Sequence, residues 1–95
     1  DLIPYHTPGH TPGHTVYYHE VDGVLLSCDM FTSKRVKLRR PMGMFTGNMT
    51  QALESARVLA ETDPSRVEMC HSAPVEQPAE QLDAYLRKYG IKAAD

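Results

Sequence analysis

Residues 6–14 read HTPGHTPGH, in which three histidines are spaced four residues apart. This spacing would place the imidazoles on one face of a helix, but both gaps contain a proline and a glycine, which exclude a helix. Apolar runs that favour strands lie on either side, at residues 2–5 and 15–20. We therefore expect a loop between two strands, stiffened by proline and sharply bent at glycine. Such a backbone would hold the imidazoles in place before a metal ion binds.

The three histidines differ in their surroundings. His10 has a Pro-Gly pair on both sides and is the strongest candidate for a metal ligand. His14 opens the following strand and is expected to support and orient a ligand, as metal-bound histidines normally require. His6 is a candidate for the same supporting role, although a loop histidine is more often structural or simply exposed.

Two more ionisable residues follow expected strands. Asp29 comes soon after the apolar run 24–26, and His71 comes directly after a run of strand character at 66–70. Taken alone, a turn aspartate or an exposed histidine would explain each. In α/β proteins, however, the carboxyl ends of strands commonly carry the site. Neutral imidazole suits zinc or iron, and a carboxylate can bridge two cations.

The remaining pattern predicts a mixed α/β chain. The expected elements are strands at 2–5, 15–20, 23–27 and 66–70, a hairpin turn at 21–23, helices at 48–61 and 78–89, and an irregular loop at 31–47. Asn48 and Gln51 form a capping-box pattern at the start of the first helix. Asp63 and Pro64 are expected to end this helix, and Gly90 is expected to cap the second.

Composition excludes several classes of protein. The 95 residues are 41% hydrophobic and 23% charged, as in one small globular domain or part of a larger one. A formal charge of -2 does not favour nucleic acid as a partner, and no apolar run approaches the roughly 18 residues of a membrane span. Cys28 and Cys70, the two cysteines, form no CxxC pair, so we expect no disulfide framework and a cytoplasmic location.

The ordered motifs resemble the C-terminal half of the metallo-β-lactamase superfamily, including its glyoxalase II-like and lactonase-like hydrolases. HTPGHTPGH before a strand is similar to the third metal motif, whose middle histidine is a ligand. LLSCD is similar to the strand that ends in Ser/Thr-Gly-Asp, and CH at the end of RVEMCH is similar to the last metal histidine. The resemblance implies His10, Asp29 and His71 as ligands, with Asp29 as the catalytic residue that bridges two metals. Cys28 stands where the family usually has glycine.

The resemblance implies half of an αββα sandwich, with one mixed sheet and two helices, and makes residues 1–95 the C-terminal part of the domain. The HxHxDH motif, which supplies four more ligands in the family, occurs nowhere in the chain. Each metal would then receive only two ligands from this chain, so we expect the chain to be a fragment that is inactive alone. Its inner sheet face would lie bare, and we expect the missing half or a second copy to cover it. The residues expected on that face are Val16, Tyr18, Leu25 and Met69.

The implied function is hydrolysis of a small ester, thioester, lactone or lactam by a metal-bound hydroxide on two zinc ions, with iron or manganese as alternatives. Two other interpretations stay open. Relatives with one iron ion oxidise thiol-linked sulfur and leave the last histidine unused. A chain that keeps the fold and has lost the chemistry would be a binding or assembly module, which the missing HxHxDH motif would explain.

Two further features allow more than one interpretation. Residues 34–40 carry a basic run, KRVKLRR, which is either a solvated loop or a site beside the metals for a carboxylate or phosphate of the substrate. A nucleic-acid role for this run is a minor option. Cys28 and Cys70 are expected to pack in the core and to face away from the metals, because neighbouring strand side chains alternate. A thiolate metal ligand is the alternative.

Overall fold

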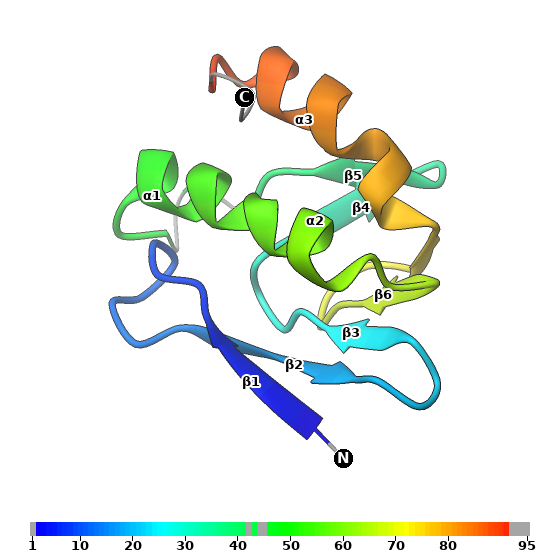
Figure 1. Ribbon diagram of the computed structural model, residues 1–95. Helices are drawn as coiled ribbons and strands as arrows, with labels where there is room; N and C mark the ends of the chain where they lie inside the picture. Colours follow the sequence, from blue (N-terminus) through cyan, green and yellow to red (C-terminus); the bar gives the residue numbers. More distant parts are fainter. Residues whose placement is uncertain (1, 42, 44–45, 92–95) are drawn as a thin grey trace.

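A five-stranded sheet runs through the computed structural model, which describes residues 2–41, 43 and 46–91. Its order is β1-β2-β3-β6-β7, and neighbours are antiparallel except β3 and β6, which are parallel. The strands are β1 (Leu2–His6), β2 (Thr15–His19), β3 (Val24–Leu26), β6 (Arg66–Glu68) and β7 (Val75–Glu76). In Figure 1 the helices lie on one side of this sheet. The mixed sheet with two helical segments confirms the predicted fold class.

The predicted first helix is present but is interrupted by a tighter turn. It consists of α1 (Met49–Glu54), the 3₁₀ turn η2 (Ser55–Arg57) and α2 (Val58–Thr62). Asn48 is the N-cap, and its Oδ1 accepts the Gln51 N–H at 3.0 Å. The segment ends at Asp63, just before Pro64, as predicted, and Asp63 adopts a left-handed conformation.

The predicted second helix is also confirmed. It comprises the 3₁₀ turn η3 (Pro78–Gln81) and α3 (Leu82–Lys88). Gly90 follows with a φ of 76°, which glycine adopts without steric cost. No helix in the described part of the chain is long and apolar enough to cross a membrane.

The predicted irregular loop at 31–47 is wrong over its first part, which forms a hairpin. Strands β4 (Thr32–Lys34) and β5 (Lys37–Arg39) pair antiparallel around Arg35 and Val36. Both turn residues have positive φ, as tight hairpin turns require, but neither is the usual Gly, Asn or Asp. The sequence therefore carries no turn signal at this point. The two-residue strand β7 was likewise not predicted.

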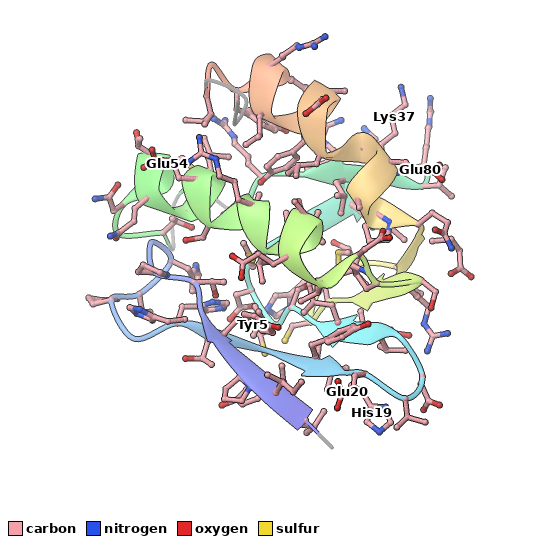
Figure 2. All side chains as sticks on the ribbon, in the orientation of Figure 1. Tyr5, His19, Glu20, Lys37, Glu54 and Glu80 are labelled. Carbon is pink, nitrogen blue, oxygen red and sulfur yellow. The ribbon has the colours of Figure 1, made fainter. Side chains whose placement is uncertain are left out.

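The core lies between the sheet and the helices. Phe31 packs edge-to-face on Tyr85, with ring centroids 5.5 Å apart. In Figure 2 the Tyr5 side chain lies on the helix side of the sheet, whereas His19 and Glu20 lie below the sheet, near the end of β2. The buried apolar cluster comprises Val16, Leu25, Met30, Phe31, Leu38, Leu53, Ala56, Val58, Leu59, Val67, Val75, Leu82, Tyr85 and Leu86.

The residues expected on the bare sheet face are not there. Val16 and Leu25 are completely buried in the core, and Tyr18 and Met69 pack against it. The prediction was wrong because the chain's own helices cover this more apolar face. Since side chains alternate along a strand, the uncovered face presents their neighbours, such as Tyr17 and Leu26. These two residues are paired across β2 and β3 and keep exposed fractions of 40% and 37%.

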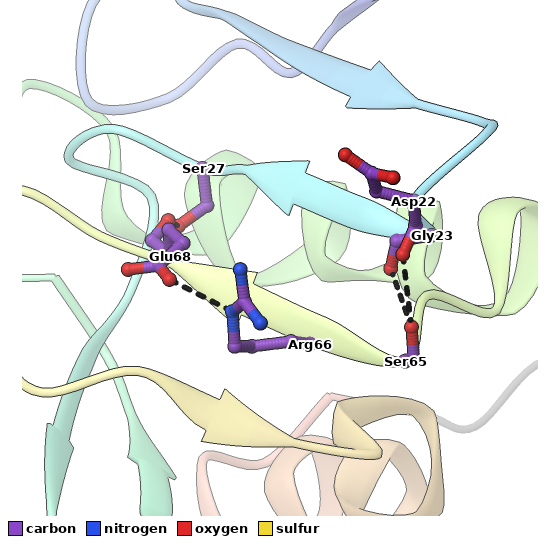
Figure 3. Close-up of polar contacts among 6 residues, drawn as sticks. All are labelled: Asp22, Gly23, Ser27, Ser65, Arg66 and Glu68. Atoms are coloured by element: carbon purple, nitrogen blue, oxygen red, sulfur yellow. Dashed lines mark hydrogen bonds and ion pairs between the residues drawn. The ribbon is translucent and has the colours of Figure 1, made fainter.

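Hydrogen bonds flank the parallel pair β3 and β6 at both ends (Figure 3). At the start, the Ser65 N–H and hydroxyl both donate to the carbonyl of Gly23, at 2.7 and 3.0 Å. At the end, the Ser27 N–H and hydroxyl both donate to the carbonyl of Glu68, at 2.8 and 2.9 Å. These bonds help to keep the two strands in one register.

The two faces of β3 predict different mutational costs. Leu25→Ala should lower the free energy of unfolding by about 2–5 kcal/mol, because it leaves a cavity in the core. Leu26→Ala should lower it by about 1 kcal/mol or less, because this side chain is partly exposed. Urea denaturation of the two variants measures the difference. Equal losses would contradict the assignment of the faces.

Candidate functional site

The histidine loop lies directly against the start of α1. A side chain at Gly9 would place its Cβ 2.1 Å from the backbone nitrogen of Ala52, so only glycine permits this approach. Gly9 also has a φ of 137°, which is unfavourable for other residues. Its carbonyl accepts the Asn48 N–H at 2.8 Å, and the His10 carbonyl accepts the Gly47 N–H at 3.1 Å. In a complete capping box the Gln51 side chain would also accept the Asn48 N–H. Here that N–H bonds to the Gly9 carbonyl in the loop instead.

The register of β3 and β6 brings Asp29 to His71. Val24 pairs with Arg66 and Leu26 with Glu68, and Asp29 and His71, which lie beyond the strands, are separated by the same sequence offset. The Nε2 of His71 lies 3.1 Å from Oδ1 of Asp29. Two residues that are distant in sequence therefore meet because two short strands are parallel.

His10 reaches the same carboxylate from the histidine loop. Its Nε2 lies 3.6 Å from Oδ2 of Asp29, so each carboxylate oxygen is close to a different imidazole. The Nδ1 of His10 is 3.2 Å from the Thr46 hydroxyl, which orients the ring with Nε2 toward Asp29. A small hollow at this point is lined by His10, Asp29, Phe31, Thr32 and His71.

The donor set fits part of a metal site. Two ligands of one tetrahedral zinc ion, with bonds of about 2.1 Å, lie about 3.4 Å apart. The observed nitrogen-to-oxygen separations of 3.6 and 3.1 Å are close to this value on both sides of the carboxylate. Among the residues that the structure describes, no three His, Cys, Asp or Glu side chains converge as ligands of one ion. The residues present can therefore offer one imidazole and one carboxylate oxygen to each of two ions.

Residues 1–71 match the family model of the metallo-beta-lactamase superfamily. The chain belongs to the metallo-β-lactamase superfamily. A curated relative, described as the probable metallo-hydrolase YybB of Bacillus subtilis (strain 168), is 31% identical over 85 residues. The match covers 90% of this chain and 39% of the relative, so the chain spans less than half of that protein's length.

Solved structures of the superfamily share this fold. A metallo-beta-lactamase family protein from Thermus thermophilus aligns with a TM-score of 0.67 and 28% identity, over 92% of this chain and 30% of that protein. The BLEG-1 B3 metallo-beta-lactamase aligns with a TM-score of 0.63 and 27% identity, over 88% of this chain and 39% of that protein. An archaeal superfamily protein from Sulfolobus tokodaii has a TM-score of 0.70 at 18% identity, over 97% and 34% of the two chains, which shows a common fold.

The two histidines predicted to support the site, His14 and His6, have different contacts. The ring of His14 packs edge-to-face on His10, with centroids 5.8 Å apart, and its Nδ1 lies 3.0 Å from the Thr7 hydroxyl. Burial lowers the pKa of His14, and the nearby His10 lowers it further. His6 is exposed, and its Nε2 donates to the Pro12 carbonyl at 2.8 Å, which closes the loop. A supporting role for both residues in a metal site stays a prediction.

Cys28 occupies the position at which the resemblance implies glycine, and the backbone conformation there suits glycine. Its φ is 54°, in the left-handed region that glycine adopts readily. Strand alternation does not apply to either thiol, since β3 ends at Leu26 and β6 at Glu68. Cys28 is partly buried and Cys70 is exposed, so core packing of Cys70 was a wrong expectation. Burial raises the pKa of the Cys28 thiol, and the nearby Cys70 and Asp29 side chains add to the shift.

The basic run lies on the β4–β5 hairpin, and at least Lys37 lies away from the hollow. Lys37 lines a separate cavity of about 440 Å³ between β5 and the last helical segment, together with Gln81 and Lys88. Figure 2 shows Lys37 near Glu80, which lines the same cavity. The side chains of the run are exposed at Lys34, Arg35, Lys37, Arg39 and Arg40.

Sequence reasoning missed the neutral residues around the site. Thr46 orients His10 although it lies 36 residues away. Phe31 and Thr32 form a wall of the hollow. Thr46 and Thr32 fall in a stretch without periodicity. Nothing in the neighbouring sequence indicates that a hydroxyl or a ring from this stretch lies at the site. Their positions depend on how the histidine loop and the β4–β5 hairpin pack.

Gly9 and Gly13 make a matched pair for testing the loop contact. Gly9→Ala should lower the free energy of unfolding by at least about 2 kcal/mol, since its methyl group overlaps the backbone of Ala52. Gly13→Ala should change it by less than about 0.5 kcal/mol, since no atom lies within 4 Å of the added Cβ. Thermal or urea denaturation measures both. A neutral Gly9→Ala variant would show that the loop does not pack on α1.

Proposed function

We propose that this chain supplies the C-terminal part of the active site of a metal-dependent hydrolase with two metal ions. His10 is a ligand of one ion, His71 is a ligand of the other, and Asp29 bridges them. The observation that carries the proposal is the arrangement of the Asp29 carboxylate, whose two oxygens lie 3.6 and 3.1 Å from two different Nε2 atoms. The relative described as a probable metallo-hydrolase supports the same class of reaction.

The chain's own residues would hold and orient the reacting groups. Asp29 would keep two cations close together by offsetting their repulsion, and Thr46 would keep the His10 Nε2 directed at its ion. A bound pair of zinc ions, or of iron or manganese, would lower the pKa of a water molecule to near neutrality and stabilise the oxyanion of an attacked carbonyl. We infer an ester, thioester, lactone or lactam as the substrate, because each has a carbonyl that hydroxide can attack.

Two ligands per ion are too few for catalysis by this chain alone. Catalytic zinc sites have three protein ligands, and this chain contains no HxHxDH motif to supply the others. We propose that residues outside this chain complete the site and that the isolated chain is inactive. The relatives have ample length for such residues, since the chain covers only 30–39% of them.

Metal content and turnover test this proposal. The longest protein that contains this chain should bind two zinc ions and hydrolyse at least one compound from a panel of esters, thioesters, lactones and β-lactams. Asp29→Ala should lower turnover more than about 100-fold, because disturbing even a group behind a metal ligand costs 10–100-fold. His19→Ala is the control, since His19 lies at the far end of β2 beside Asp22.

Other outcomes would replace the proposal. One bound iron ion together with sulfur oxidation would favour the mononuclear alternative, in which His71 is not a ligand. If the protein binds two ions and the Asp29→Ala variant keeps its turnover, the bridging role of Asp29 is contradicted. Absence of both metal and turnover in the longer protein would favour a binding or assembly module.

We further propose that the uncovered sheet face is an association surface. Leu2, Tyr17 and Leu26 are exposed on β1, β2 and β3, on the side away from the helices. Exposed apolar patches of monomers are usually covered by a partner. The rest of a longer protein would cover this face, and in the isolated chain a second copy would do so.

Sedimentation of the isolated chain tests this surface. We expect dimers or larger species at micromolar concentration, and Leu26→Lys should shift them toward monomer because it introduces a charge into the face. Val21→Lys is the matched control, since Val21 is exposed at the β2–β3 turn. A wild-type chain that stays monomeric would contradict self-association, and an equal shift in both variants would place the contact elsewhere.

A further inference from the structure

We propose that Cys28 and Cys70 form a reversible dithiol–disulfide site that links the two loops after β3 and β6. They are the only two cysteines of the chain. Each lies one residue before a proposed metal ligand, Asp29 in one loop and His71 in the other. The proposed metal site includes neither thiol, so these two cysteines are available for a different role.

The backbone brings the two cysteines side by side just beyond the parallel strands. The sequence offset that relates Leu26 to Glu68 in the register also separates Cys28 from Cys70. The Cys70 N–H donates to the Cys28 carbonyl at 3.1 Å, so the chains are still adjacent after the strands have ended. Adjacent strands lie about 4.8 Å apart, and a disulfide joins Cα atoms about 4.4–6.8 Å apart. The backbone spacing therefore suits a disulfide between the two cysteines.

Exposure sets the order of the reaction with a low-molecular-weight disulfide, RSSR. Exposed Cys70 attacks first as a thiolate, which forms a Cys70–S–S–R mixed disulfide and releases one RSH. Partly buried Cys28 then attacks the sulfur of Cys70, forms the Cys28–Cys70 bond and releases the second RSH. The two thiol protons leave with the two released thiols. The protein loses two electrons, and RSSR gains them.

The disulfide would act on the neighbouring site through the backbone. It would join the residues directly before Asp29 and His71, whose side chains are already in contact at 3.1 Å. Oxidation would therefore restrict how far these two side chains can separate. This consequence for metal binding rests on the proposed function, whereas formation of the disulfide does not.

Mass spectrometry of the whole chain in a series of glutathione redox buffers tests the proposal. We expect a monomer that loses two hydrogens, and a tryptic fragment pair joined through Cys28 and Cys70. The ratio of disulfide to dithiol protein should be proportional to the concentration of oxidised glutathione divided by the square of the concentration of reduced glutathione. The square arises because two reduced molecules form from each oxidised one. Stable glutathione adducts, disulfide-linked dimers or two thiols that stay reduced across the series would each overturn the proposal.

Single serine variants separate the two steps. Cys28→Ser should accumulate one glutathione on Cys70, since no second thiol resolves the mixed disulfide. Cys70→Ser should be modified several-fold more slowly, because Cys28 is partly buried. Equal rates would contradict the order of attack, and a Cys28→Ser variant free of any adduct would contradict the role of Cys70 as the entry point.

A double serine variant distinguishes this proposal from the proposed function. Under reducing conditions it should keep the metal content and turnover of the longer protein, whereas Asp29→Ala loses turnover. Loss of a metal ion in the double variant would overturn the dithiol site and identify a thiolate as a ligand. Disulfide formation in a protein that binds no metal would leave the dithiol site intact and contradict the hydrolase.

Discussion

The parallel pairing of β3 with β6 is the contact on which the candidate site depends. One register relates Leu26 to Glu68 within the strands, and the same offset relates Asp29 to His71 beyond them. Ser27 holds the end of this pair by donating both its N–H and its hydroxyl to the Glu68 carbonyl. A slip of one residue would turn each side chain of a strand to the opposite face. The carboxylate and the imidazole would then no longer meet.

A second long-range contact brings His10 to this pair. The histidine loop lies on the start of α1 because Gly9 has no side chain to collide with Ala52. The Asn48 N–H, which a capping box would satisfy locally, bonds to the Gly9 carbonyl instead. The start of the helix and the placement of His10 therefore depend on one set of backbone hydrogen bonds. Thr46, just before this helix, contacts the Nδ1 of His10.

The layout of the molecule is one-sided. Helices cover one face of the sheet (Figure 1), and the opposite face keeps exposed apolar residues such as Tyr17 and Leu26. The candidate site has a similar asymmetry, since the chain could offer only one imidazole and one carboxylate oxygen to each of two ions. Both features agree with a chain that covers only 30–39% of its superfamily relatives. Under the proposed function, the same residues outside this chain would cover the apolar face and complete the metal site.

Local chemistry made part of this structure predictable. Proline restricts φ and glycine destabilises a helix, so the residues between the histidines exclude one. Asn48 and Pro64 mark the ends of the first helical segment through their own hydrogen-bonding and steric properties. The superfamily was also predictable, because its motifs are short and contiguous. The hairpin at Arg35 and Val36 was not, since residues that normally avoid positive φ occupy its turn.

The sequence by itself determined which side chains could serve a metal site, because residue type sets the donor atoms of His10, Asp29 and His71. Only the tertiary structure decided that they meet, that Leu25 rather than Leu26 is buried, and that Cys28 lies opposite Cys70. The physical reason is the same in each case. These relations depend on the register between strands that are distant in the sequence and on the face that the helices cover, and neither leaves a local pattern.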